Sequence, residues 1–186
     1  EVLAFLNNDV EVINSDWLTE MVSHALRSDI GAVGAMLYYP NDTIQHAGVV
    51  LGVGGLANHA HRLLPKGHPG YMSRAVLLQS FSAVTGACLV TRRALFEEVG
   101  GFDEELGVAY NDIDLCLRLG ARGYRTLWTP YAELYHHESA SRGSDQAPSL
   151  RERFNRESAI FRERWKQAIA DDPYYSPNLT NDKEDF

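Results

Sequence analysis

The stretch VLAFLNNDVEV, residues 2–12, sets a short apolar run directly against three small polar residues. Residues 2–6 have the length and composition of a buried strand, and Asn7, Asn8 and Asp9 follow where that strand would end. In open α/β sheets, ligands bind at the carboxyl edge of the strands. A carboxylate beside two amides offers the hard oxygen ligands that Mg²⁺ or Mn²⁺ carrying phosphates requires. The alternative is an ordinary turn, because Asn and Asp are also turn residues.

The length and composition predict one globular domain. The chain has 186 residues, of which 45% are hydrophobic, and a formal net charge of −8. This charge argues against a non-specific nucleic-acid binder, which would carry a basic face. The two cysteines lie in apolar runs without a CxxC motif, which favours a reducing compartment. With neither a signal peptide nor an apolar run of membrane-spanning length in the sequence, we expect a cytoplasmic protein.

Strand and helix patterns alternate along the chain. Further apolar runs predict strands at 32–39, 82–91, 124–128 and 132–135, and a hairpin through 44–51 within a weakly patterned excursion at 41–79. Apolar spacing of three and four predicts helices at 17–27, 92–99, 111–122 and 150–169, with Ser15 and Asn111 as N-caps of the first and third. This order predicts an α/β fold with a mixed sheet flanked by helices. We expect residues 149–186, the last helix and an acidic tail, to pack on a domain formed by residues 1–148.

The segment NDIDLCLRLGARG, residues 111–123, places two acids near the start of a predicted helix. Asp112 lies in the first turn, where the helix dipole keeps a carboxylate ionised and able to accept a proton. It can equally be a first-turn acid that only stabilises the helix. Asp114 and Arg118 are four residues apart, so they can simply pair on the helix surface.

The segment ELYHHESASRG, residues 133–143, follows a predicted strand. His136 and His137 point in opposite directions if the strand continues, so one of them can face a site. Imidazole is a competent ligand for metals such as Mn²⁺, and Arg142 lies in a small polar loop that suits phosphate binding. Exposed histidines and an ordinary linker are the alternatives. His59 and His61 have the spacing of a metal pair, but no third ligand is evident beside them.

Taken together and in this order, these stretches resemble the inverting family 2 glycosyltransferases of the GT-A fold. The matching segments are LNND (6–9), TGACLVTRRALFEEVGGFDEEL (85–106), NDIDLCLRLGARGYR (111–125), ELYHHESASRG (133–143) and DPYYSPNL (172–179). They extend over nearly the whole chain. Within the family, the chain is most similar to bacterial enzymes that build surface polysaccharides, such as rhamnosyltransferases.

The resemblance implies a role for each motif. Asp9 would hold Mn²⁺ or Mg²⁺ on the donor diphosphate together with His136, and Asn8 would contact the donor. Asn7 stands where the family has the first acid of its metal motif. Asp112 would be the catalytic base, following Asn111 where the family commonly has Glu.

Further contacts are assigned by position within the resemblance. Arg142 would close over the donor diphosphate and shield it from water. Thr85, Gly86 and Asp114 are assigned to the acceptor pocket.

The implied activity is transfer of a sugar from a nucleotide-diphosphate sugar to a hydroxyl of a glycan or lipid-linked acceptor, with inversion and metal assistance. Such an enzyme is expected in the cytoplasm, or as a peripheral protein at the inner membrane face, without a nucleic-acid partner. One alternative is a non-catalytic glycan-binding or scaffolding domain, because Asn7 and Asn111 replace acids of the family. A metal-dependent phosphohydrolase is another, but the dense Asp/His clusters of two-metal hydrolysis are missing from the sequence.

The family domain normally begins before the strand that leads into the metal motif. The chain is therefore expected to be the C-terminal portion of a GT-A domain, truncated in its nucleotide-binding half. In isolation it should bind nucleotide weakly or not at all and be inactive. It should also expose a sheet edge through which two copies can associate.

Overall fold

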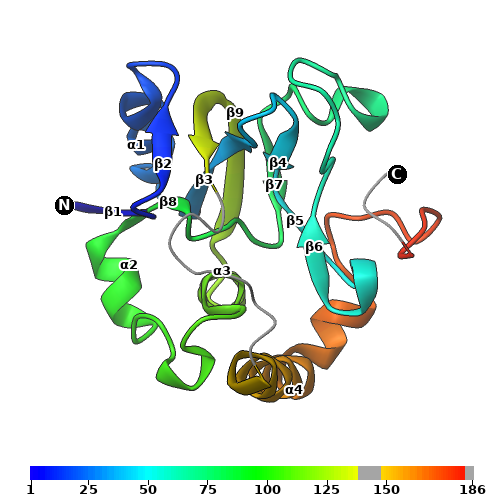
Figure 1. Cartoon of the computed structure of the whole chain (residues 1–186). Coiled ribbons are helices and arrows are strands. Elements are labelled where there is room, and N and C mark those ends of the chain that lie inside the picture. The colour runs from blue at the N-terminus through cyan, green and yellow to red at the C-terminus, as the bar shows by residue number, and fades with distance from the viewer. Residues whose placement is uncertain (138–147, 183–186) are drawn as a thin grey trace.

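The centre of the molecule is a seven-stranded mixed sheet (Figure 1). The computed structural model describes residues 1–137 and 148–182, with side chains in the last helix from residue 151 onward. The main strand order is β1-β8-β3-β9-β2, with β4 beside β3 and β7 beside β9. The strands are β1 (Val2–Leu6), β2 (Val10–Val12), β3 (Ile30–Tyr38), β4 (Ile44–His46), β7 (Gln79–Phe81), β8 (Cys88–Arg92) and β9 (Arg125–His136). A separate two-stranded sheet pairs β5 (Val49–Leu51) with β6 (Ala57–His59).

Helices cover this sheet from two sides. The α-helices of the described ranges are α1 (Trp17–Ala25), α2 (Arg93–Glu98), α3 (Asn111–Ala121) and α4 (Pro148–Ala170), and the 3₁₀ helices are η1 (Val53–Gly55), η2 (Tyr71–Ser73) and η3 (Glu104–Leu106). In Figure 1, α3 and α4 lie together at the bottom, whereas α1 lies at the upper left. Within residues 1–137 and 148–182, we find no helix with the length and apolar composition needed to cross a bilayer.

The core is built around β3, all of whose residues are buried. Because side chains alternate along a strand, Ala32 and Met36 pack in one hydrophobic cluster and Val33 and Leu37 in another. The first cluster includes buried residues of α3 and α4, and the second includes Met21 and Ala25 of α1. Burial on both faces explains why the β3 sequence is almost continuously apolar.

The predicted α/β class, mixed sheet and four helices are confirmed. The sheet is mixed because β3 and β9 run parallel, while the other pairings given for its strands are antiparallel. Both cysteines are buried in the core, as their apolar surroundings predicted, and burial raises the pKa of each thiol to about 12.

The bounds of three predicted strands differ in the structure. Residues 124–128 and 132–135 belong to one strand, β9, which passes through Pro130 at an irregularity in its pairing with β3. Residues 82–91 are not one strand, because β7 ends at Phe81 and β8 begins at Cys88. The intervening segment is apolar because it is buried against β3. A Cβ added to Gly34 would lie 2.4 Å from Cβ of Val84.

The predicted hairpin through 44–51 is also not formed. β4 pairs with β3, and the chain then turns at Gly48, where φ is +98°. β5 follows this turn and pairs with β6 rather than with β4. The excursion therefore has regular structure, and Asp172, which follows α4, holds it by a hydrogen bond with Leu51. The Asp172 carboxylate accepts hydrogen bonds from Leu51 N and Ser82 Oγ, both at 2.7 Å.

The predicted helix caps differ as well. The residue before α1 is Asp16 rather than Ser15, and its side chain makes no capping hydrogen bond within the described chain. α3 is preceded by Tyr110, which has a left-handed backbone with φ of 64°, so Asn111 is the first helical residue rather than the cap. This start places Asp112 in the first turn, as predicted.

Candidate functional site

A cleft of about 820 Å³ opens where β1 and β9 end. Several separate parts of the chain contribute to its walls, including Phe154 of α4. The polar residues of the lining are Asn7 and Asp9 after β1, Tyr39 after β3, His136 at the end of β9, Thr85 before β8, Asn111 and Asp112 of α3, and Gln45, Asn58, His59 and Arg62 from the excursion. Asp9, His136 and Asp112 thus share one hollow, as the sequence predicted.

Strand pairing joins Asp9 to His136. β2 runs antiparallel to β9 with Val10 opposite His136, and His137 N donates a hydrogen bond to Asp9 O at 2.9 Å. The His136 Nε2 atom consequently lies 3.2 Å from Asp9 Oδ1. His137 points the other way and is partly exposed, with its Nε2 atom 3.1 Å from Glu11 Oε2. The alternation of the two histidines along the strand is therefore confirmed.

The hydrogen bonds of His136 determine which of its nitrogens carries the proton. Nδ1 lies 2.6 Å from Gln45 Oε1, and a carbonyl oxygen only accepts, so Nδ1 is the donor. Nε2 then carries a lone pair, which accepts from Asn7 Nδ2 at 3.1 Å. Asp9 Oδ1 is buried, and none of the described residues donates a hydrogen bond to it. A lone pair and an unsatisfied carboxylate oxygen facing each other are the ligand set that a divalent cation fits.

This ligand set is small. The described ranges contain no group of three or more His, Cys, Asp and Glu side chains able to hold a metal ion. A metal held by Asp9 and His136 would thus take its other ligands from substrate and water, as Mg²⁺ and Mn²⁺ do when they carry phosphates. Asn7 occupies the lone pair that such a metal needs, so its amide has to turn away for the ion to bind.

Asp112 also lines the cleft, and two backbone amides hold its carboxylate. Gly86 N donates to Asp112 Oδ2 at 2.7 Å, and Ile113 N donates to Oδ1 at 2.8 Å. A Cβ added to Gly86 would lie 3.2 Å from Cβ of Asp112, so glycine allows this close approach. Each carboxylate oxygen keeps a second lone pair, and the N-terminus of α3 favours its negative charge. The side chain is therefore oriented and able to accept a proton.

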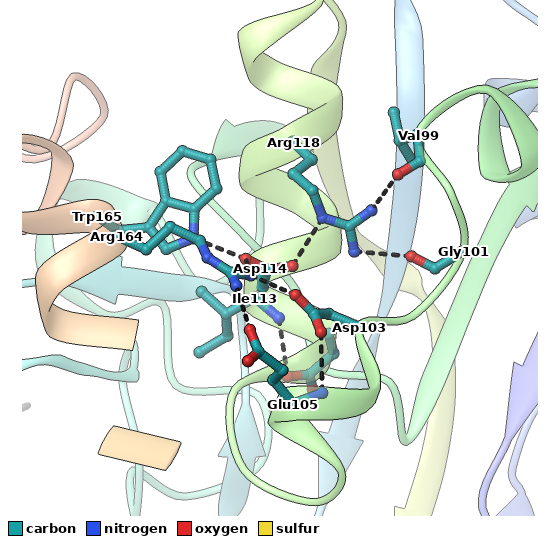
Figure 2. A network of polar contacts seen from close by, with 10 residues as sticks. Val99, Gly101, Asp103, Glu105, Ile113, Asp114, Arg118, Arg164 and Trp165 are labelled. Carbon is teal, nitrogen blue, oxygen red and sulfur yellow. Dashed lines mark hydrogen bonds and ion pairs between the residues drawn. The ribbon is translucent and has the colours of Figure 1, made fainter. Parts of the chain in front are cut away.

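The acceptor-binding prediction for Asp114 is wrong. Its buried carboxylate accepts hydrogen bonds from Arg118 Nε at 2.7 Å, Arg164 Nη1 at 2.9 Å and Trp165 Nε1 at 2.8 Å (Figure 2). It does not belong to the lining of the cleft. The alternative pairing with Arg118 is confirmed, but it lies in the interior, where it joins α3 to α4. Periodicity places both residues on one helix face and does not reveal that α4 covers that face.

The other predicted contacts are placed as follows. Thr85 and Gly86 line the cleft. Asn8 is exposed and lies outside the lining, so the structure brings Asn7 rather than Asn8 into the cleft. Arg142 lies outside the described residues.

Sequence reasoning did not identify the individual residues that the excursion contributes to the cleft. Arg62 donates to Tyr39 Oη from Nε at 3.0 Å and from Nη2 at 2.9 Å. His59 lines the cleft and pairs with His46, whereas His61 is buried outside the lining, so the suggested metal pair does not form. Burial lowers the pKa of His61 to about 4. The sequence contained a signal for the contribution of this region to the cleft, because the residues between Asp42 and Glu97 include histidines and arginines but no acid.

Comparison with known proteins identifies relatives across the whole chain. Residues 3–165 match the model of the family described as Glycosyltransferase like family 2. The uncharacterized protein y4gI of Sinorhizobium fredii is 56% identical over 187 residues, covering 100% of this chain and 21% of that protein. The O-antigen biosynthesis protein RfbC of Myxococcus xanthus is 44% identical over 181 residues, covering 97% of this chain and 14% of RfbC. The chain thus spans less than a quarter of either relative.

The fold has counterparts among solved structures. The mannosyltransferase PcManGT of Pyrobaculum calidifontis, solved in complex with GDP-Man and Mn²⁺, aligns with a TM-score of 0.55 at 16% identity, covering 92% of this chain and 40% of that chain. At this identity the likeness concerns the fold, which is GT-A. The family match over most of the chain, together with this fold, shows that the chain belongs to glycosyltransferase family 2.

Proposed function

We propose that this chain is the catalytic part of an enzyme that transfers a sugar from a nucleotide-diphosphate sugar to a hydroxyl of a glycan or lipid-linked acceptor, with inversion. The observation that carries the proposal is the convergence of Asp9, His136 and Asp112 on one cleft. Family membership supports the reaction class. The O-antigen role in the name of RfbC supports a polysaccharide acceptor, and the GDP-Man bound by PcManGT supports a nucleotide-sugar donor.

Asp9 and His136 are the residues that would hold a divalent cation, Mn²⁺ or Mg²⁺. Their fit rests on the lone pair at His136 Nε2 and the unsatisfied Asp9 Oδ1, and the Mn²⁺ of PcManGT agrees with it. Gln45 has the supporting role, because its carbonyl holds the proton of His136 on Nδ1 and keeps Nε2 available. When bound, the metal supplies positive charge that neutralises a departing diphosphate.

Asp112 is the proposed general base. It accepts the proton of the acceptor hydroxyl while that oxygen forms a bond to the anomeric carbon of the donor sugar. The bond between this carbon and the diphosphate oxygen breaks, and the nucleoside diphosphate leaves with the electron pair. One displacement of this kind inverts the anomeric centre. Gly86 N and Ile113 N keep the carboxylate in a single orientation during the step.

The test is sugar transfer by a longer protein that carries this segment, assayed over a set of nucleotide sugars with Mn²⁺. Asp112→Asn should lower kcat by about 100-fold or more, because general-base catalysis contributes at least that much. Asp9→Ala should abolish the dependence on Mn²⁺. The matched control is Asp16→Asn, an exposed acid outside the cleft, which should transfer as the parent does. Unchanged sugar transfer by Asp112→Asn would show that Asp112 is not the general base.

One observation favours a second candidate, a non-catalytic glycan-binding domain. Asn7 stands where the family has an acid, and its amide engages the lone pair of His136. Glycan binding by a protein that transfers no sugar from any donor, with or without Mn²⁺, would decide for this alternative.

A further inference from the structure

Two consecutive backbone amides of the cleft wall hold two different side chains. Gly86 N donates to Asp112, and Thr85 N donates to Nε2 of His46 at 3.4 Å. His46 is fully buried, and its Nδ1 atom lies 2.7 Å from Nδ1 of His59. The two rings are nearly perpendicular, at 86° with centroids 4.9 Å apart. His59 lines the cleft, so a continuous hydrogen-bonded path runs from the wall to the cleft surface.

This path determines the tautomers of both histidines. A backbone amide only donates, so Nε2 of His46 is the acceptor and the single ring proton of His46 lies on Nδ1. That proton points to Nδ1 of His59, which must accept it. The ring proton of His59 therefore lies on Nε2, the nitrogen away from His46. A charged His46 would set a second N–H against the amide of Thr85, and burial lowers the pKa of His46, so His46 stays neutral. His59 then carries a single ring proton as long as its Nδ1 accepts from His46.

We propose that His59 is an acceptor-specificity residue, a neutral Nε2–H donor that hydrogen-bonds an uncharged oxygen of the acceptor sugar. This inference rests on the proposed sugar transfer. Gly86 N holds Asp112, and Thr85 N holds His46, which in turn contacts His59. His59 and Asp112 line the same cleft, so an acceptor that brings its attacking hydroxyl to Asp112 enters the space that His59 lines. The oxygen recognised is a hydroxyl or an N-acetyl carbonyl.

The histidine couple also excludes two other roles for His59. It cannot be the base while its Nδ1 accepts from His46 and its Nε2 carries the proton, which leaves proton removal to Asp112. It is also poorly suited to phosphate, since charge-assisted donors are the strong phosphate ligands and His59 is uncharged. Variants of His59 should therefore affect acceptor binding and leave donor binding unchanged.

The first test reads the tautomers directly and needs no activity. In the ¹⁵N-labelled chain, long-range ¹H–¹⁵N correlation spectra distinguish the Nδ1–H and Nε2–H forms of histidine. With seven histidines, each signal can be assigned by single His→Gln variants. We expect His46 as the Nδ1–H form and His59 as the Nε2–H form. An Nδ1–H form of His59 would overturn the proposal.

The second test uses the methyl glycosides of glucose and N-acetylglucosamine as probes. Titrated into the labelled chain, they should shift the His59 Nε2 signal together with the amides of Thr85 and Gly86. A shift of the two amides that leaves His59 unchanged would place the sugar elsewhere and overturn the contact.

The third test measures transfer in a longer protein that carries the segment. His59→Phe keeps a ring but removes the donor, and should raise the acceptor KM about 10-fold with the donor KM unchanged, whereas His59→Gln restores a donor and should stay within about 3-fold of the parent. His68→Phe is the matched control, an exposed histidine outside the cleft lining. A change in donor KM alone, or equal values for His59→Phe and His68→Phe, would refute the role. A parent that transfers no sugar would contradict the proposed function, and the two measurements on the chain would still decide this inference.

Discussion

His136 Nε2 lies 3.2 Å from Asp9 Oδ1, although the two residues are far apart in the sequence. Asp9 follows β1, the first strand, and His136 ends β9, the last. The pairing of β2 with β9 creates this contact, and Gln45 holds the imidazole with its lone pair toward the carboxylate. Asn7 donates to the same lone pair. This arrangement supports the proposed cation site, in which Asn7 would compete with the ion for the lone pair of His136.

Replacing Asn7 with Asp should strengthen binding of divalent cations. The change removes the amide that competes for His136 and adds a negative charge beside Asp9. We expect Mn²⁺ affinity to rise about 10-fold, which corresponds to about 1.4 kcal/mol, measured by calorimetry or by the electron paramagnetic resonance of free Mn²⁺. Asn8→Asp is the matched control, since it adds the same charge at an exposed position outside the cleft. Equal affinities for the two variants would show that Asn7 has no special position.

Asp114→Asn should destabilise the fold rather than alter the site. The carboxylate is buried between Arg118 and Arg164, and removing its charge leaves both guanidinium groups without that compensation (Figure 2). We expect a loss of about 3–5 kcal/mol in the free energy of unfolding, measured by urea denaturation. Asp16→Asn, at an exposed position, should stay within about 0.5 kcal/mol of the parent. A small effect of Asp114→Asn would mean that the network contributes little to joining α3 and α4.

Stability should fall as the pH is lowered from about 6.5 toward 4. Burial lowers the pKa of His61 from 6.5 to about 4, so the unfolded chain binds a proton through this interval that the folded chain does not. The unfolded state is therefore favoured increasingly as the pH falls, by up to roughly 3 kcal/mol from this group. Burial lowers the pKa of His46 in the same direction.

Urea unfolding between pH 7.5 and 5 would measure this effect above the range in which most carboxylates titrate. His61→Gln should reduce the slope of stability against pH, whereas His68→Gln, at an exposed position, should leave it unchanged. Parallel curves for the parent and His61→Gln would contradict the assignment.

The free edge of β1 should allow two copies to associate. Among the described strands β1 pairs only with β8, and Ala4 in its middle is exposed. Unpaired N–H and C=O groups at an edge can pair with a second strand. We expect light scattering to show a dimer that grows with concentration and is weakened by Ala4→Lys. The control is Leu26→Lys, at an exposed position after α1. A strictly monomeric parent would count against association through this edge.

Much of the local structure was predictable because it depends on neighbouring residues. Apolar spacing located the four helices, and the VLAFL run is β1 with the predicted bounds. The predictions that the structure corrects share a cause. An apolar run indicates that a segment is buried, but it determines only in part whether that segment is a strand, a helix or a loop. Residues 82–87 are apolar because they pack against β3 at Gly34, although they are not a strand. Asp114 was misassigned because the covering helix α4 is distant in sequence.

By itself the sequence determined the α/β class, the four helices, the family, and the residues at its three motifs, Asp9, Asp112 and His136. Only the tertiary structure decided which side chains meet: the β2–β9 register joined Asp9 to His136, and the excursion brought Gln45, His46 and His59 to the cleft. The physical reason is that periodicity and capping are local, within a turn or two of chain. Contacts between distant segments depend on strand register and on which faces pack together, and no local pattern encodes these.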